Sequence, residues 1–146
     1  MKKKSFSMRF AALLLIVFFV ACKKKAQPQN NNPVPYAPVA LSIYPNDPLS
    51  FQIQSVGGWK YIDGGINGIL VYRKSEQEFV AIERTSSVLP DNKLAKVYVQ
   101  SDNFTLSDTV SKSEWRIFDG AVSKGASWPL RVYGSTFDGN LLRIVN

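Results

Sequence analysis

The chain has 146 residues, of which 45% are hydrophobic and 20% are charged. This composition and length are typical of a one-domain globular protein, and they exclude a collagen, a coiled coil and a wholly disordered chain. The sequence contains no histidine, and its single cysteine is Cys22. Zinc sites, Ser-His-Asp and Cys-His catalysis, thiolate-held iron–sulfur clusters and a disulfide within the chain are therefore excluded.

The positive charge is concentrated at the start of the chain. The formal net charge is +7, but four basic residues precede Cys22 with no acidic residue among them, which leaves +3 for the remainder. The sequence has no glycine-rich phosphate loop before a helix and no basic patch interleaved with aromatic residues. We therefore expect no nucleic-acid partner, because a basic isoelectric point alone is weak evidence for one.

Residues 1–21 are predicted to be a secretory signal peptide. A basic opening, with Lys2, Lys3, Lys4 and Arg9, is followed by an apolar stretch of twelve residues that ends at Ala21. This order is typical of a signal for export. A permanent membrane anchor is the alternative, but a helix that spans a bilayer needs about 20 apolar residues.

The end of this segment points to lipid attachment at Cys22. The sequence Phe19-Val20-Ala21-Cys22 resembles a bacterial lipobox, in which the signal is cut before the cysteine and the thiol becomes a thioether with diacylglycerol. Phe19 replaces the usual leucine, which fits the looser pattern of Bacteroidetes lipoproteins. The resemblance implies a cell-envelope protein whose first partner is the lipid bilayer, through Cys22.

Residues 22–38 are predicted to be a disordered tether. Three lysines follow Cys22, and then comes a run rich in Gln, Asn and Pro that offers no apolar face to bury. The lysines either contact anionic headgroups or form a solvated charge run. Bacteroidetes lipoproteins sent to the cell surface often carry acidic residues at this place, so the lysines favour an anchor that faces the periplasm over the cell surface.

Residues 39–146 are predicted to form one all-β domain, an antiparallel β sandwich or small barrel. Hydrophobic residues alternate with others in short runs separated by turn-forming residues, and no segment keeps a helical period over twelve residues. The turns are predicted at Asn46-Asp47-Pro48, Gly57-Gly58, Asp63-Gly64-Gly65, Pro90-Asp91-Asn92, Asp119-Gly120 and Asp138-Gly139. The alternating pairs are Leu41/Ile43, Phe51/Ile53, Trp59/Tyr61, Ile69/Val71, Phe79/Ala81, Val97/Val99, Trp115/Ile117, Leu130/Val132 and Leu142/Ile144.

Several of these segments resemble a known family in their order and spacing. The motifs are Gly57-Gly58-Trp59-Lys60-Tyr61, the run from Gly64-Gly65 to Tyr72-Arg73, Phe79-Val80-Ala81-Ile82-Glu83-Arg84-Thr85, Pro129-Leu130-Arg131-Val132-Tyr133 and Phe137-Asp138-Gly139. Together they are similar to the Rieske-type iron–sulfur domain as found in small Bacteroidetes lipoproteins. The resemblance covers residues 39–146 and implies a Rieske-like fold.

The resemblance also locates the positions at which the family holds its [2Fe–2S] cluster. Aligning Arg84-Thr85 with the family's lead-in strand puts Ser86 and Val88 in the first ligand pair. Aligning Ser113-x-Trp115 with the second loop puts Asp108 and Ser111 in the second pair. Such a cluster needs two thiolates on one iron and two imidazoles on the other. The ligands are all missing, so we expect a degenerate site with no cofactor, although the family implies a cluster.

With the cluster gone, we expect packing to close the two loops. Apolar side chains are expected to fill the space, namely Val88, Leu89, Trp115 and Phe118. Serine hydroxyls are expected to cap freed backbone groups, namely those of Ser86, Ser87, Ser111 and Ser113. A new ligand site in these loops is the less favoured alternative.

The remaining candidates favour structural roles. Glu83-Arg84 is expected to be a buried ion pair that fixes the loop, and the turn aspartates Asp102, Asp108, Asp119 and Asp138 are expected to bond nearby amides. Aromatic residues are expected mainly in the core, with an exposed surface for glycan or protein as the alternative, namely Trp59, Tyr61, Tyr72, Trp128 and Tyr133. Asp108-Thr109-Val110 resembles the Bacteroidetes O-glycosylation acceptor, which would modify Thr109.

Taken together, the sequence predicts an envelope lipoprotein with a cluster-free Rieske-like β domain that acts as a binding or scaffolding module for another envelope protein. No catalytic residue is predicted, so we do not expect an enzyme. The alternatives are a component of an envelope electron-transfer system and an enzyme that uses turn carboxylates.

Overall fold

The computed structural model describes residues 31–146. Within this part of the chain, ten strands and one short 3-10 helix follow one another, and none of the helical structure is long and apolar enough to cross a membrane. The elements are β1 (Ala40–Ile43), η2 (Pro48–Ile53), β2 (Trp59–Ile62), β3 (Ile69–Arg73), β4 (Phe79–Glu83), β5 (Val97–Val99), β6 (Thr105–Asp108), β7 (Glu114–Arg116), β8 (Val122–Lys124), β9 (Val132–Phe137) and β10 (Leu142–Val145).

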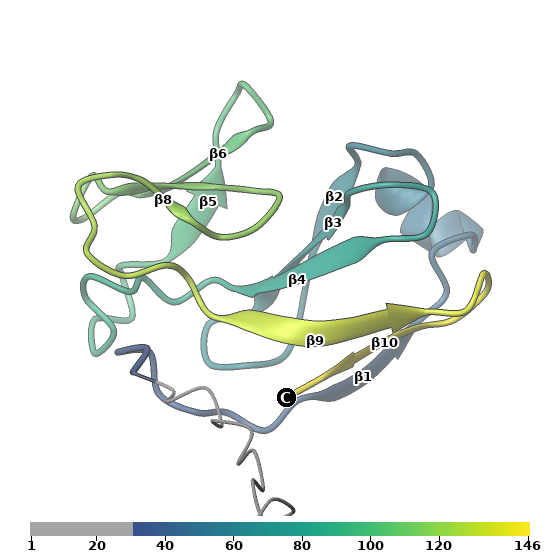
Figure 1. Ribbon diagram of the computed structural model, residues 1–146, viewed down its shortest axis with the longest axis horizontal. Helices are drawn as coiled ribbons and strands as arrows, with labels where there is room; N and C mark the ends of the chain where they lie inside the picture. Colours follow the sequence, from purple (N-terminus) through teal and green to yellow (C-terminus); the bar gives the residue numbers. More distant parts are fainter. Residues whose placement is uncertain (1–30) are drawn as a thin grey trace, which may run out of the picture. The chain divides into compact units, whose positions relative to one another are not determined.

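The strands form two antiparallel sheets. The larger sheet has six strands in the order β1-β10-β9-β4-β3-β2, and the smaller sheet has four in the order β5-β6-β7-β8. Figure 1 shows the smaller sheet at one end of the larger sheet, where β4 ends and β9 begins. The predicted all-β class is therefore confirmed.

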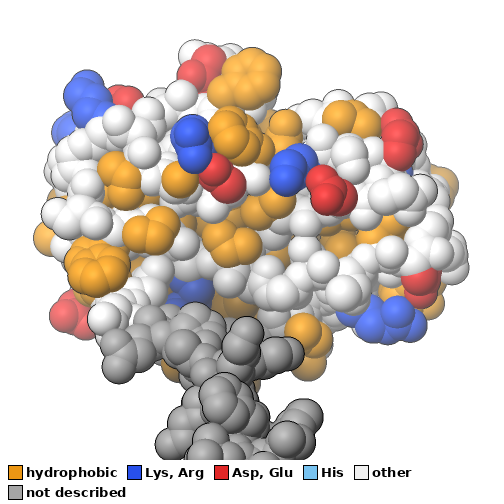
Figure 2. All heavy atoms as spheres, in the orientation of Figure 1, with side chains coloured by type: hydrophobic (Ala, Val, Ile, Leu, Met, Phe, Trp, Pro, Cys, Tyr) orange, Lys and Arg blue, Asp and Glu red, His pale blue; other side chains and the backbone are white. Residues whose placement is uncertain are grey.

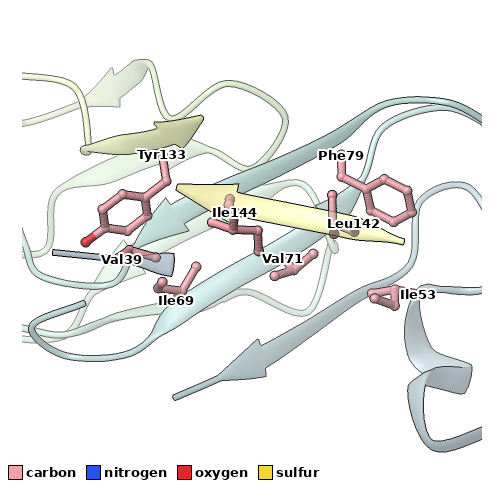
Figure 3. Packing of buried hydrophobic residues seen from close by; sticks show 9 residues of the cluster. Val39, Ile53, Ile69, Val71, Phe79, Tyr133, Leu142 and Ile144 are labelled. Carbon is pink, nitrogen blue, oxygen red and sulfur yellow. The ribbon is translucent and has the colours of Figure 1, made fainter. Parts of the chain in front are cut away.

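Two hydrophobic clusters hold the sheets together. One lies on the larger sheet and contains Ile69, Val71, Ala81 and Ile144, all completely buried, with other members drawn in Figure 3. The other cluster joins residues of β3 and β4 to Leu106 and Trp115 of the smaller sheet, among others. Alternate residues of β3 and β4 thus face different clusters, so that β3 is buried along its whole length.

One predicted strand is wrong. The Phe51/Ile53 alternation belongs to the helix η2, whose first turn is fixed by a cap and a proline. The Asp47 side chain accepts a hydrogen bond from the Leu49 amide at 2.7 Å, and Pro48 follows it at the start of the helix. Ile53 is fully buried while Phe51 is 67% exposed, so only one of the two apolar residues reaches the core.

Residues 31–38, which the sequence analysis placed in the tether, contact the β domain. The Val34 side chain is buried, and the backbone carbonyl oxygen of Val34 accepts a hydrogen bond from the Arg131 guanidinium. The Asn32 side-chain amide donates to the Pro129 carbonyl at 3.1 Å, and the Asn146 side-chain amide donates to the Ala37 carbonyl at 2.7 Å. We call this set of contacts the N-terminal clasp. The predicted signal peptide and Cys22 lie outside the described residues.

Candidate functional site

Three connections meet where the smaller sheet joins the larger one. The first loop is residues 84–96 between β4 and β5, and the second is residues 109–113 between β6 and β7. The third is residues 125–131 between β8 and β9. A bridge between Thr85 and Lys96 closes the base of the first loop. The four positions aligned with cluster ligands lie in the first loop and around the second one.

The Asp108 carboxylate ties the first loop to the second. Asp108 is the last residue of β6 and is fully buried. It accepts hydrogen bonds from the Ser111 hydroxyl at 2.7 Å and from the Val110 amide at 2.7 Å, and the Ser86 hydroxyl lies beside it. Burial alone raises the pKa of Asp108, but these hydrogen bonds outweigh it and bring the pKa below its ordinary value. Three of the four aligned positions therefore meet at one ionised carboxylate.

Serine hydroxyls satisfy backbone groups throughout these loops, as expected from the sequence. The Ser86 hydroxyl accepts from the Val88 amide at 3.2 Å, and the Ser111 hydroxyl accepts from the Ser113 amide at 3.3 Å. The third connection is tied in by two further bonds: the Ser87 hydroxyl donates to the Trp128 carbonyl at 2.6 Å, and the Ser113 hydroxyl donates to the Gly125 carbonyl at 3.0 Å.

The expected apolar filling of the site is only partly right. Trp115 is completely buried, and its indole nitrogen donates to the Trp128 carbonyl at 3.0 Å. Val88 and Phe118, however, are each 37% exposed and lie at the surface. The loops are thus closed mainly by hydrogen bonds, because the residues at the aligned positions are polar and need buried partners.

The donors at the four aligned positions do not fit a [2Fe–2S] cluster. They offer two hydroxyls and one carboxylate, and Val88 has no donor atom. Thiolates and imidazoles are the ligands that such clusters use. The hydroxyls of Ser86 and Ser111 and the carboxylate of Asp108 are already engaged with one another.

A second buried carboxylate, Glu83 at the end of β4, acts as a hub beside the first loop. It is fully buried and accepts five hydrogen bonds. One carboxylate oxygen accepts from the Ile66 amide at 2.8 Å and from the Tyr133 hydroxyl at 2.6 Å. The other accepts from the amides of Asn67 and Thr85, both at 3.0 Å, and from the Thr85 hydroxyl at 2.8 Å. All five partners donate, so the site fits an ionised carboxylate.

Arg84 does not form the expected ion pair with Glu83, since no such pair is found among residues 31–146. Its guanidinium carbon lies 3.5 Å from the ring centroid of Tyr61 and 4.9 Å from that of Tyr98. Its Nε donates to the Val97 carbonyl at 3.1 Å. Burial lowers the pKa of Arg84, and the arginine serves to join β2 to β5 by stacking.

The other turn aspartates bond to residues close to them in the sequence, as expected. Asp102 accepts from the Phe104 and Thr105 amides, Asp119 pairs with Arg116, and Asp138 accepts from amides of its own turn. The described part of the chain has no group of three or more acidic residues or cysteines that would hold a metal ion. Thr109 is exposed, and its glycosylation stays a prediction.

The aromatic residues divide between core and surface. Tyr133 and Tyr72 are buried, as expected for core residues, whereas Trp128 is 44% exposed. Trp59 and Tyr61 are half-buried and line a groove with two amide side chains, those of Gln52 and Asn103. No sequence signal pointed to these two amides, since Gln52 lies in the helix that was predicted as a strand and Asn103 lies 44 residues from Trp59.

Comparisons with known proteins give a likeness among solved structures. No protein-family profile matches the chain, and no curated protein matches it either. Among solved structures, it is similar to the ferredoxin of carbazole 1,9a-dioxygenase from Nocardioides aromaticivorans IC177. The identity is 16%, the TM-score is 0.48, and the match covers 75% of this chain and 98% of that one. Because identity and TM-score are both low, no residue role is taken from this likeness.

Proposed function

We propose that this chain is a cell-envelope lipoprotein whose β domain is Rieske-like but holds no iron–sulfur cluster, and that the domain works as a binding or scaffolding module for another envelope protein. Lipidation at Cys22 is the proposed anchor, with the domain facing the periplasm. The contacts of residues 31–38 favour a free tether that ends near residue 31.

The proposal that the domain holds no cluster rests on how the residues at the positions aligned with cluster ligands are bonded. Ser111 donates to Asp108, the Ser86 hydroxyl lies beside this carboxylate, and Asp108 also accepts from backbone amides. A buried carboxylate with these partners closes the two loops without any added group, because each polar atom is satisfied from within the chain. Binding iron here would require these hydrogen bonds to break and would gain no thiolate in return.

The test is the iron and acid-labile sulfide content of the purified full chain, with a visible spectrum, after anaerobic reconstitution in detergent. We expect a colourless protein with no stoichiometric iron. A coloured protein with about two irons per chain, the content of such a cluster, would overturn the proposal and make electron transfer the leading function.

The anchor is tested separately through the one cysteine of the chain. We expect Cys22→Ser to leave the precursor uncut by the lipoprotein peptidase and to abolish labelling with a radioactive fatty acid. The control is the unmodified chain expressed in the same cells. Continued labelling of the variant would contradict lipidation at this residue.

A further inference from the structure

A groove lies between the edge strand β2 of the larger sheet and the turn that joins β5 to β6. It is lined by Trp59 and Tyr61 on one side and by Gln52, Gly58 and Asn103 around them. Its volume of about 620 Å³ is within the range of small-molecule sites. We propose that this groove binds β-linked pyranose sugars. The inference deepens the proposed binding module by naming a class of ligand.

The aromatic wall of the groove is fixed before a ligand arrives. Trp59 and Tyr61 are two residues apart on β2, and their ring centroids lie 5.1 Å apart at an angle of 52°. The Trp59 indole nitrogen donates to the Asn103 side chain at 3.1 Å, and the Tyr61 hydroxyl accepts from the Val99 amide at 2.9 Å. Both rings are therefore held from the smaller sheet, which lowers the entropic cost of binding.

A β-linked pyranose offers what these rings can use. Its axial C–H bonds make one face of the ring apolar, while its hydroxyls point outward along the edge. An aromatic ring binds the apolar face through dispersion and burial of apolar surface. Trp59 and Tyr61 are only half-buried, but one face of the Tyr61 ring is covered by the Arg84 guanidinium, so Trp59 is the main stacking surface of the groove.

Two amide side chains, those of Gln52 and Asn103, line the groove beside the rings and can bond to sugar hydroxyls. The Asn103 side-chain oxygen is taken by Trp59, so its amide NH₂ group remains as a donor. Gln52 is exposed, and its side chain has no hydrogen-bond partner among residues 31–146. At Gly58, another lining residue, a Cβ atom would collide with the Gln52 carbonyl oxygen, so this position requires glycine.

The residues that line the groove favour binding without hydrolysis. No aspartate or glutamate is among its lining residues in the described chain, and glycoside hydrolysis needs a pair of carboxylates. Lys60 is the charged residue of the lining, and its ammonium donates to the Leu49 carbonyl at 3.1 Å.

The test is a titration of the full chain with cellohexaose, followed by the indole ¹⁵N–¹H signals of its three tryptophans. The protein is kept in a polyoxyethylene detergent, because detergents with sugar headgroups would compete. We expect a saturable shift of the Trp59 signal with a Kd at or below about 1 mM. The signals of buried Trp115 and of Trp128 serve as internal controls and should stay in place.

Three variants sharpen the result. Trp59→Ala should weaken binding about tenfold or more, and Trp59→Phe should restore part of it, because a smaller ring face remains. Asn103→Gly should weaken binding several-fold while keeping the local backbone, since Asn103 has a φ of 59° that glycine adopts freely. Trp128→Ala, the matched control, should bind as the unmodified chain does.

The inference is overturned if the Trp59 signal shows no saturable shift, if the Trp128 signal shifts equally, or if a folded Trp59→Ala binds cellohexaose unchanged. Iron content, measured on the same sample, tests the proposed function independently. A colourless protein that ignores cellohexaose contradicts the sugar site alone, while an iron-bearing protein that binds it contradicts the cluster-free proposal alone.

Discussion

Glu83→Gln is expected to destabilise the domain strongly, although it changes only one group of the side chain. All five partners of the carboxylate are donors, and three of them are backbone amides. The new amide nitrogen must take the place of one oxygen. Its better position faces Ile66 and Tyr133, because the Tyr133 hydroxyl can turn to accept, but the Ile66 amide then loses its acceptor.

The magnitude follows from these contacts. A buried donor without a partner costs about 1–3 kcal/mol, and the remaining bonds lose the strength that a charged acceptor gives them. The neutral glutamine has a smaller desolvation penalty than the buried carboxylate, which offsets part of this loss. We expect a net loss of about 3 kcal/mol, a large part of the roughly 5–15 kcal/mol that stabilises a domain.

Urea unfolding followed by tryptophan fluorescence measures this loss. With an m value of about 2 kcal/mol/M, the midpoint should fall by about 1.5 M at unchanged m. Glu78→Gln is the matched control, since the Glu78 side chain is 63% exposed in a surface ion pair, and it should cost less than about 0.5 kcal/mol. If Glu83→Gln costs no more than this control, the hub reasoning is refuted.

Three further predictions concern the same domain. Asp108→Asn should lower the free energy of unfolding by about 2 kcal/mol at pH 7. Because the pKa of Asp108 lies below 3.8 in the folded chain, this stabilisation should fade as the pH falls through the lowered value. Equal urea midpoints of the variant and the unmodified chain at pH 7 would contradict the prediction. Burial, and then the bond to the neighbouring carboxylate, raises the pKa of Tyr133 above 10.0, so the unfolded chain loses this proton first and stability should fall above pH 10. Tyr133→Phe should flatten that fall in urea titrations at pH 9 to 11, and an equally steep fall in the variant would count against it. A fragment of residues 39–146 should be about 2 kcal/mol less stable than one of residues 31–146, because the buried Val34 is removed; calorimetry that finds equal unfolding temperatures would contradict the role of the clasp.

Alternation predicted the strands that carry at least two apolar residues on a buried face, and it failed where a strand has one apolar residue or is exposed. β8 is exposed along its length, and β6 has a single apolar residue, Leu106, so neither strand carries a hydrophobic pattern. The Phe51/Ile53 pair looked like a strand because a spacing of two does not distinguish it from a tight 3-10 turn. There the signal was Asp47-Pro48, a cap followed by a proline.

The candidate site was predictable in its chemistry and less so in its packing. The sequence already showed that the aligned positions lack thiolates and imidazoles, and the capping role of the serines followed from their residue type. The meeting of Ser86 with Asp108 depends on how the first loop folds back beside β6. These two residues are 22 positions apart in the sequence, and no local pattern predicts their contact. Val88 faces solvent because these polar partners take the inner positions.

The N-terminal clasp has a mechanical consequence for a chain that is anchored at Cys22. Tension arriving from the anchor meets the contacts of Asn32 and Val34 before it reaches the hydrogen bonds that pair β1 with β10. The clasp is therefore the first part to yield, and its release leaves both sheets in place. Release frees residues 32–38, whose fully extended length is about 25 Å, so under the proposed anchor at Cys22 the distance between domain and membrane depends on pulling force.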